Sequence, residues 1–175
     1  MTEEQAARGR AQQAAPLQLR TGLGYDLHPY AAGRPLVLGG VEVAYPRGLA
    51  GHSDGDVLCH AVIDALLGAA GLGDVGEWFP PDATTPRGVR SLGLLEQVAA
   101  RLREEGWRVV NVDTVVVAQE PRVAPHRAAM RANLAGALGV EPERVNVKAT
   151  APERLGALGR ADGVAALATT LIERE

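Results

Sequence analysis

The pattern of apolar and polar residues predicts several β-strands along the chain. Alternation marks the segment 17–27, a run rich in β-branched residues marks 109–118, and 145–150 is predicted as a short strand. In PLVLGGVEVAY, over 35–45, two apolar runs flank a Gly-Gly pair, which predicts a β-hairpin. The last apolar segment, 163–172, fits a strand or a helix equally well.

Apolar residues spaced three and four apart predict three helices. The first begins near Ser53-Asp54, which offer an N-cap, and ends in the glycine-rich stretch 68–73. The second begins at Ser91, as its cap, after a proline-containing loop at 77–90. The third spans 125–138, where Gly139 stops it. This order predicts an α+β domain, a mixed β-sheet with helices packed on one face.

Composition narrows the class of protein. The 175 residues are enough for one domain, placed at 18–175 after a flexible, Ala- and Gln-rich tail at 1–17. With 46% apolar and 22% charged residues the chain is globular, and its net charge of −3 argues against nucleic-acid binding through bulk positive charge. No apolar run reaches the roughly 18 residues of a membrane span. An aromatic content of only 3% limits what a monomer can bury, which favours an oligomer.

The expected compartment follows from cysteine and the N-terminus. A single cysteine, Cys59, rules out an intrachain disulfide and suits a reducing environment. Glu3 and Glu4, with no apolar segment after them, argue against a secretion signal. We therefore expect a cytoplasmic protein of bacterial type with no membrane partner.

Two clusters of metal-binding residue types stand out. In the strand motif DLH at 26–28, the carboxylate and the imidazole lie on the same face. On the first helix, Asp56, His60 and Asp64 are spaced four apart and would share one face. One carboxylate and two imidazoles as protein ligands, with a fourth position open, are the pattern of a catalytic Zn²⁺ site. Ordinary hydrogen bonds of the two histidines explain the spacing equally well.

Other residues suit phosphate binding. The Ser53 hydroxyl, with His52 beside it and the free N–H groups of the following helical turn, could seat an anion, although an ordinary N-cap is the commoner meaning. Lys148, the only lysine, lies near a strand end, close to the carboxylate of Glu153, which could hold Mg²⁺. A solvated loop explains this second group almost as well.

Five ordered motifs resemble one enzyme family closely. They are GYDLHPY, LAGHSDGDVLCHAVIDALLGAAGLGDVG, the FPP segment, VVNVDTVVVAQEPRVAPH and VNVKATAPERLGALGRADG. Together they are similar to the 2-C-methyl-D-erythritol 2,4-cyclodiphosphate synthases of non-mevalonate isoprenoid biosynthesis, from about 19 to 172. Long motifs in a fixed order rarely coincide by chance.

The resemblance implies a homotrimer with a chorismate-mutase-like α+β fold, whose sheets pack together and whose active sites lie between subunits. It implies a lyase that converts 4-diphosphocytidyl-2-C-methyl-D-erythritol 2-phosphate into the cyclic diphosphate and CMP. Zn²⁺ and a second cation, Mg²⁺ or Mn²⁺, would be its cofactors. An isoprenoid diphosphate on the trimer axis, held by Arg160, is a further expectation.

The resemblance also implies roles for individual residues. Asp26, His28 and His60 would bind zinc, and Glu153 the second cation. His52, Thr150 and Ala151 occupy the positions of the catalytic residues. Substrate contacts would come from Asp26, His28, His52, Ser53, Asp74, Val75, Gly76, Phe79, Asp82, Ala83, Ala118, Gln119, Glu120, Pro121, Arg122, Val123, Ala124, Lys148, Thr150, Ala151, Pro152, Glu153, Ala157 and Arg160. Residues 118–124 would frame the cytidine from a neighbouring subunit.

Three departures from the family pattern affect these roles. Ala151 stands where many members have a threonine, so Thr150 or backbone N–H groups would stabilise the transition state. Ala83 and Arg90 replace carboxylates of the substrate loop, and Ala157 replaces an axial phenylalanine.

Two alternative functions are a trimeric binding module without turnover and a zinc hydrolase with His52 as the base. Release of CMP from the substrate separates the synthase from both.

Overall fold

A five-stranded mixed sheet forms one layer of the protein. The computed structural model describes residues 18–174, so the tail expected at 1–17 lies outside the described residues. The strand order is β4-β1-β7-β5-β6; β5 and β6 run parallel and the other pairs antiparallel. The strands are β1 (Leu19–Ala31), β4 (Gly48–Leu49), β5 (Trp107–Val117), β6 (Val145–Thr150) and β7 (Gly163–Arg174).

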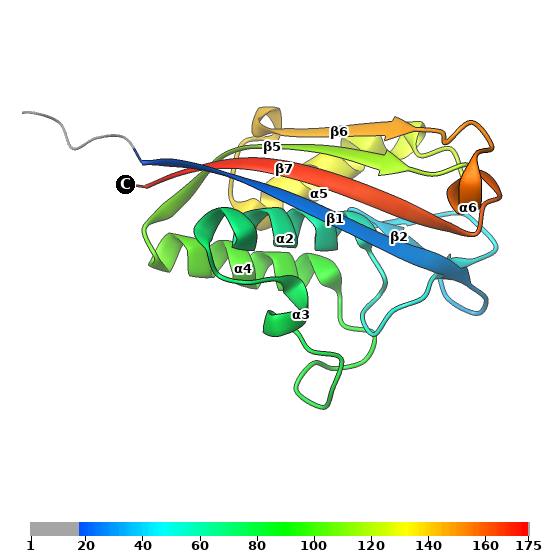
Figure 1. The fold of residues 1–175 in the computed structure, drawn as a ribbon, viewed down its shortest axis with the longest axis horizontal. Coiled ribbons are helices and arrows are strands. Elements are labelled where there is room, and N and C mark those ends of the chain that lie inside the picture. The colour runs from blue at the N-terminus through cyan, green and yellow to red at the C-terminus, as the bar shows by residue number, and fades with distance from the viewer. Residues whose placement is uncertain (1–17, 175) are drawn as a thin grey trace, which may run out of the picture.

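Helices cover one face of this sheet (Figure 1). The helix α2 packs directly under β1 and β7, with α4 beside it and α5 against β6. This arrangement confirms the predicted α+β class. The helices are α2 (Val57–Ala70), α3 (Val75–Trp78), α4 (Ser91–Glu104), α5 (Arg127–Leu138) and α6 (Gly156–Gly159), with short 3-10 turns at Ala124–His126 and Pro142–Arg144.

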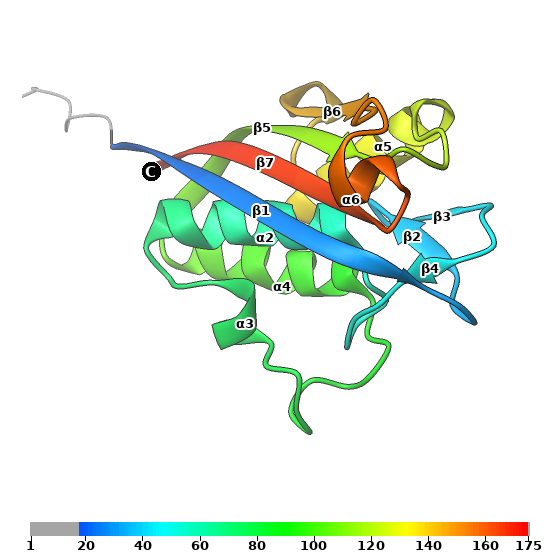
Figure 2. The same cartoon turned by 45° about the vertical axis from the view of Figure 1, so that its right-hand side comes forward.

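The predicted hairpin is confirmed as a separate two-stranded sheet, β2 (Leu36–Leu38) and β3 (Val41–Val43), beside the end of β1 (Figure 2). Its turn residues Gly39 and Gly40 have φ of 56° and 69°, the left-handed values that this tight turn requires. Their N–H groups donate to the two carboxylate oxygens of Asp56, at 2.9 and 2.7 Å. Asp56 therefore anchors the hairpin to the start of α2.

Small residues let β1 and α2 approach closely. Gly22 and Gly24 face the helix, and a Cβ on either would overlap the backbone carbonyl of Ala65 or Ala61. Alternation along the strand then places Asp26 and His28 on the same helix-facing side. The close packing of β1 on α2 thus brings two polar side chains of the strand to the N-terminal end of the helix.

Several predicted boundaries were wrong in informative ways. The N-cap of α2 is Asp56, which accepts hydrogen bonds from the N–H groups of Leu58 and Cys59, and not Ser53-Asp54. Ser91 begins α4 without capping it. Part of the predicted loop at 77–90 belongs to α3, which Asp74 caps through the N–H of Glu77. The ambiguous segment at 163–172 is a strand because it pairs with both β1 and β5.

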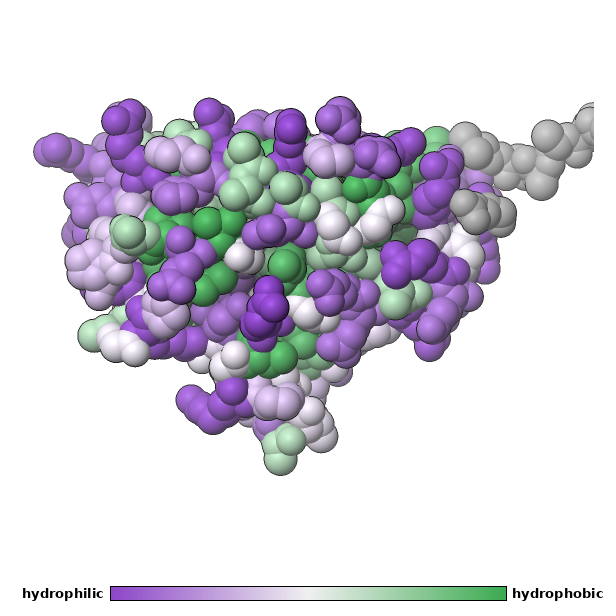
Figure 3. Space-filling view, turned by 180° about the vertical axis from the view of Figure 1, so that it is seen from behind, coloured by the Kyte–Doolittle hydropathy of each residue, from purple (hydrophilic) through white to green (hydrophobic). Residues whose placement is uncertain are grey.

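The opposite face of the sheet is not covered by helices. On β1 the alternate side chains Leu19, Leu23, Tyr25 and Leu27 point there and are about half or more exposed, with Leu23 at 67%. Figure 3 shows the molecule from the side opposite to the view of Figure 1. That side is mainly hydrophilic, with apolar residues in small patches. The chain alone therefore leaves an apolar strand face in contact with water.

Candidate active site and metal centre

Three side chains converge where β1 meets the first turn of α2. The Oδ2 atom of Asp26 lies 2.8 Å from His28 Nε2 and 2.9 Å from His60 Nδ1, and the two nitrogens are 3.3 Å apart. Among the described residues this is the one group of three or more His, Cys, Asp and Glu side chains that could hold a metal ion. The structure thus brings together the three ligands predicted from the sequence.

The donor set fits a zinc ion. His28 donates from Nδ1 to the carbonyl oxygen of Ala50, which leaves the Nε2 lone pair directed at the cluster. A tetrahedral ion with bonds of about 2.0–2.1 Å separates its ligand atoms by roughly 3.3 Å. The two imidazole nitrogens have this separation, whereas Asp26 Oδ2 lies at hydrogen-bond distance from each of them, 2.8 and 2.9 Å. One carboxylate and two imidazoles leave a fourth position open, as catalytic zinc sites do.

Charge interactions within the cluster shift two pKa values. Burial acts to raise the pKa of Asp26, but hydrogen bonds and charge interactions with His28 and His60 outweigh it, and the pKa lies well below its usual range. Burial acts to lower the pKa of His28, but its contact with Asp26 prevails and the pKa is raised. The Asp26 carboxylate therefore stays ionised, as a metal ligand must be.

A cavity of about 200 Å³ opens onto the cluster. His52 and Ser53, both predicted phosphate contacts, line it, and the Nε2 atom of His52 lies 2.5 Å from the carbonyl oxygen of Thr85. The remaining wall comes from α3, the loop after it and Leu94 of α4. All lining residues are Asp26, His28, His52, Ser53, His60, Val75, Gly76, Phe79, Thr85 and Leu94.

The wall at α3 is tied to α2. Asp64 accepts a hydrogen bond of 2.8 Å from the N–H of Val75, within the segment predicted to hold the methylerythritol. Asp74 caps α3, and Asp82 accepts bonds from Thr84 at 2.8 and 2.6 Å in the exposed loop that follows, next to Ala83. Asp64 thus positions the cavity wall.

Two parts of the sequence-based site are corrected. Asp56 and Asp64 do not join His60 in a metal-binding face: the Asp56 carboxylate is fully buried and accepts bonds from four backbone N–H groups and from the Cys59 thiol. For the same reason the first-turn N–H groups of Leu58 and Cys59 are not free to seat a phosphate. The single cysteine is buried, and burial together with Asp56 raises the pKa of its thiol.

A second groove, of about 240 Å³, combines the predicted cytidine segment with the end of β6. The side chain of Gln119 accepts a bond of 3.0 Å from the N–H of Arg154, which connects this segment to the loop after β6. The groove shares no lining residue with the metal cavity. Its lining residues are Ala118, Gln119, Pro121, Arg122, Val123, Ala124, Ala149, Thr150 and Ala151.

An aromatic cluster connects this segment to β1. Tyr30 donates to the carbonyl oxygen of Glu120, and Tyr45 donates to its carboxylate at 3.3 Å. The guanidinium of Arg47 lies 4.5 Å from the centre of the Tyr30 ring and donates to the Tyr45 hydroxyl and to the carbonyl oxygen of Ala161. Burial raises the pKa of Tyr30, which keeps its hydroxyl a donor. The cluster of Tyr30, Tyr45 and Arg47 thus contacts both Glu120, in the predicted cytidine segment 118–124, and Ala161, after α6.

The remaining predicted residues line neither of these two cavities. Lys148 forms an ion pair with Asp113 at 2.5 Å, and Arg160 one with Asp162 at 2.9 Å. Pro152 and Glu153 lie in the loop between β6 and α6 and Ala157 lies in α6, and Glu153 and Ala157 are exposed. Among the described residues no second metal-binding group forms around Glu153 within one chain. Its predicted cation stays a prediction.

Residues near the cluster were missed because they come from distant segments. Thr85 and Leu94 line the metal cavity, and the hydroxyl of Ser91 lies 2.9 Å from the outer ring nitrogen of His60. In the sequence Ser91 looks like a helix cap, and no spacing rule connects it with a histidine 31 residues earlier. No pattern in the sequence identifies these contacts.

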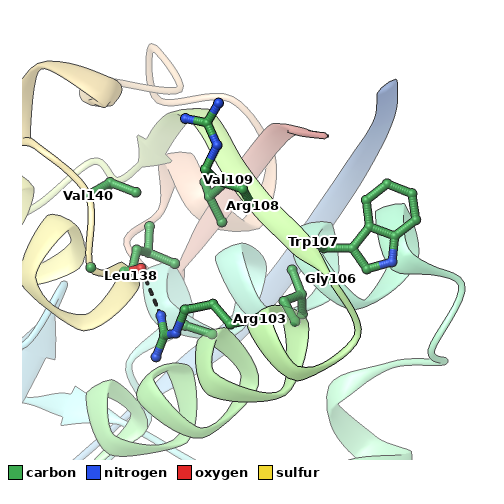
Figure 4. A pocket seen from close by; sticks show the side chains of 10 residues that line it. Arg103, Gly106, Trp107, Arg108, Val109, Leu138 and Val140 are labelled. Atoms are coloured by element: carbon green, nitrogen blue, oxygen red, sulfur yellow. Dashed lines mark hydrogen bonds between the residues drawn. The ribbon is translucent and has the colours of Figure 1, made fainter. Parts of the chain in front are cut away.

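A third cavity, of about 250 Å³, lies where the C-terminal ends of α4 and α5 meet the start of β5 (Figure 4). Arg103 donates from there to the carbonyl oxygen of Leu138, at 3.3 Å, and Arg108 pairs with Glu173. The ten residues that line it include no carboxylate, histidine or hydroxyl group. It therefore lacks the acid, base or ligand groups of a catalytic site.

Comparison with known proteins agrees with this geometry. The family model described as the YgbB family matches residues 19–173. The 2-C-methyl-D-erythritol 2,4-cyclodiphosphate synthase of Syntrophomonas wolfei is 55% identical over 156 residues, 89% of this chain and 99% of that protein. The solved bifunctional IspDF of Campylobacter jejuni has a TM-score of 0.87 at 42% identity, over 91% of this chain and 43% of that one.

A further solved structure, Plasmodium falciparum IspF in complex with CDP, has a TM-score of 0.79 at 29% identity, covering 90% of this chain and 97% of that one. None of the helices in residues 18–174 has the length and apolar character of a membrane span. The family model covers nearly all of the sequence, and a synthase matched over 99% of its own length is 55% identical in the aligned region. This chain therefore belongs to the YgbB family, the family of the 2-C-methyl-D-erythritol 2,4-cyclodiphosphate synthases.

Proposed function

We infer that this chain is a 2-C-methyl-D-erythritol 2,4-cyclodiphosphate synthase, a lyase of non-mevalonate isoprenoid biosynthesis. In that reaction the 2-phosphate of 4-diphosphocytidyl-2-C-methyl-D-erythritol 2-phosphate attacks the β-phosphorus of the same molecule. A phosphorus–oxygen bond forms, another breaks, and CMP leaves. The observation that supports this most is the Asp26, His28 and His60 cluster at the floor of a cavity.

The cluster residues would hold Zn²⁺ through Asp26 Oδ2, His28 Nε2 and His60 Nδ1. A bound zinc ion supplies positive charge that stabilises the phosphate oxygens of the reacting groups. The carboxylate of Asp26, kept ionised by its two histidine neighbours, and the two imidazoles supply the three protein ligands. The three ligand residues line the cavity, so a substrate phosphate bound there would lie beside the metal.

The remaining residues of the cavity would position the substrate. His52 and Ser53 would bind phosphate oxygens, and the segment 74–76, held by Asp64 and by the cap of α3, would hold the methylerythritol. Attack within one molecule needs no side-chain nucleophile. Holding the chain of the substrate in a folded, near-attack geometry removes several kcal/mol of the barrier.

The second groove would bind the cytidine and the diphosphate. Arg122 and the backbone of 118–124 would contact the nucleotide, while Thr150, Ala151 and Pro152 would contact the diphosphate and Glu153 the second cation. Because Ala151 has no hydroxyl, the hydroxyl of Thr150 and the backbone N–H groups beside it would stabilise the transition state. The two grooves share no residue, so one complete site would combine the metal cavity of one subunit with the groove of the next.

Product formation tests the proposed activity. Purified protein with Zn²⁺ and Mg²⁺ should convert the cytidyl diphosphate substrate into a cyclic diphosphate and one equivalent of CMP, followed by phosphorus NMR. His60→Ala should lose at least about 100-fold in activity together with its zinc, because an essential ligand is gone. Exposed Glu96→Gln on α4 is the control and should keep both.

Two results would contradict the proposal. A linear product that contains oxygen from labelled water would identify a hydrolase instead. Substrate that binds without release of CMP would identify a binding module. Full activity and full zinc content in His60→Ala would remove this residue from the ligand set.

A further inference from the structure

We propose that Asp54 and Ser91 are positioning residues that determine which ring nitrogen His60 presents to the metal. The inference rests on the metal site proposed above at Asp26, His28 and His60. Asp54 and Ser91 do not belong to that ligand set, and they come from two different segments, the loop before α2 and the first residue of α4. What connects them to the site is the outer edge of the His60 ring.

The two nitrogens of His60 face different surroundings. Nδ1 points at the cluster, 2.9 Å from Asp26 Oδ2. Nε2 points away from it and lies 2.9 Å from the Ser91 hydroxyl and 3.1 Å from the Ser53 hydroxyl. Ser91 is 0%, Ser53 6% and His60 8% exposed, so the two hydroxyls rather than bulk water must satisfy Nε2.

The proton of the Ser91 hydroxyl has one strong acceptor. The Oδ1 atom of Asp54 lies 2.5 Å from Ser91 Oγ, and an ionised carboxylate only accepts hydrogen bonds. A hydroxyl carries a single proton, so Ser91 gives it to Asp54 and offers lone pairs to His60. The Nε2 atom of His60 must then carry a ring proton. Nδ1, which faces Asp26, is therefore the nitrogen that exchanges its hydrogen bond for a bond to the metal.

Asp54 is itself held in place. Its Oδ1 also accepts from the N–H of Asp56 at 3.2 Å, and its Oδ2 accepts from the N–H of Ser91 at 3.1 Å. The N–H of Asp54 donates to the carbonyl oxygen of Val89 at 2.9 Å. A fixed carboxylate, a buried hydroxyl and the imidazole thus form one ordered relay, Asp54 to Ser91 to His60.

Two substitutions should disturb the relay to different degrees. In Asp54→Asn the new amide can donate to Ser91, which frees the Ser91 proton to turn toward Nε2 and favours the wrong ring tautomer. The dissociation constant for Zn²⁺ should rise about 10–100-fold. Ser91→Ala leaves the Ser53 hydroxyl at 3.1 Å as an acceptor, so a smaller rise is expected.

The experiment uses the full chain stripped of metal and titrated with Zn²⁺ against a competing chelator dye. In the metal-free wild type, ¹⁵N NMR of the imidazoles should show a proton on Nε2 of His60, and in Asp54→Asn the ring form without a proton on Nε2 should increase. Glu96→Gln is the matched control, because it also removes one negative charge but at an exposed position on α4. It should change neither the Zn²⁺ affinity nor the protonation of His60. Circular dichroism confirms that each variant is folded, and Ser91→Ala replaces Asp54→Asn if the latter does not fold.

The outcomes separate this inference from the proposed metal site. Two results would overturn the relay: a Zn²⁺ affinity of folded Asp54→Asn within twofold of wild type, or a His60 ring in the wild type that carries no proton on Nε2. A wild type that binds no Zn²⁺ would overturn the metal site instead. The ring protonation of His60 in the metal-free protein would then still decide whether Asp54 and Ser91 set the tautomer.

Discussion

Asp113 on β5 and Lys148 on β6 form an ion pair on the uncovered face of the sheet. The side chain of Asn146 donates a second bond, of 2.9 Å, to the same carboxylate. Partial burial acts to raise the pKa of Asp113, but the bonds from Lys148 and Asn146 outweigh it, and the pKa lies below its usual value. Within one subunit, the only lysine of the chain therefore forms its ion pair with Asp113 on the neighbouring strand.

This pair predicts a pH dependence of stability. A carboxyl group with a lowered folded-state pKa stabilises the fold above its unfolded pKa of about 4, and the contribution is lost as the pH falls through the folded value. Asp113→Asn should therefore lower the free energy of unfolding at pH 7 by about 0.2–1 kcal/mol, the range for exposed pairs. Thermal unfolding measured from pH 7 to 2 should show the difference from wild type shrinking below pH 4. A constant difference across that range would contradict the assignment.

At the scale of elements, the contact between β1 and α2 positions the metal cluster. Gly22 and Gly24 allow the strand backbone to lie against the helix backbone, and Asp26 and His28 continue along the same side of the strand. His60 lies in the first turn of α2. The distances within the cluster therefore depend on how closely these two elements pack.

Glycine substitutions test this dependence. A Cβ at position 24 would meet backbone atoms of Ala61 and Ala65, so Gly24→Ala must push the strand away from the helix and should cost about 2–3 kcal/mol or more. Gly93→Ala on α4 has no atom within 4 Å and should stabilise the protein by about 0.5–1 kcal/mol through helix propensity. Urea unfolding measures both. Equal effects of the two substitutions would show that close packing at β1 is unimportant.

At the scale of the whole molecule, the uncovered sheet face and the divided site point to the same assembly. Leu23 and Tyr25 are 67% and 54% exposed on β1, a large apolar exposure for a strand centre. Packing three such faces together would bury them and would place the groove around Arg122 next to a neighbour's metal cavity. We therefore propose a homotrimer of about 55 kDa, three chains of 18.3 kDa each.

Subunit mixing tests this assembly. His28→Ala lacks a metal ligand and Arg122→Glu lacks the proposed nucleotide contact, so each alone should be inactive. After exchange of subunits, some interfaces would combine two intact halves, and a measurable fraction of wild-type activity should return. Leu23→Glu should abolish assembly and activity together because it places a charge in the buried face. An active species of about 18 kDa by light scattering would refute the trimer.

Short-range patterns in the sequence were enough for much of this protein. The strand 145–150, the Gly39-Gly40 turn and the end of α5 at Gly139 were predicted correctly because spacing, turn geometry and helix stop signals act between neighbours along the chain. The three residues of the candidate metal site were also predicted, since Asp26 and His28 share a strand face and the ordered motifs identified the family. The roles of the other site residues, from His52 to Arg160, stay predictions.

Only the tertiary structure decided what depends on contacts between distant segments. Asp56 looked like a ligand on a helix face, but the N–H groups of a hairpin turn 16 residues earlier bind its carboxylate. Ser91 looked like a cap, but its hydroxyl lies against His60 across 31 residues. The final segment became a strand because two partners flank it. Each of these segments or side chains interacts with a part of the chain that only tertiary packing brings close. The local sequence pattern does not identify such a partner.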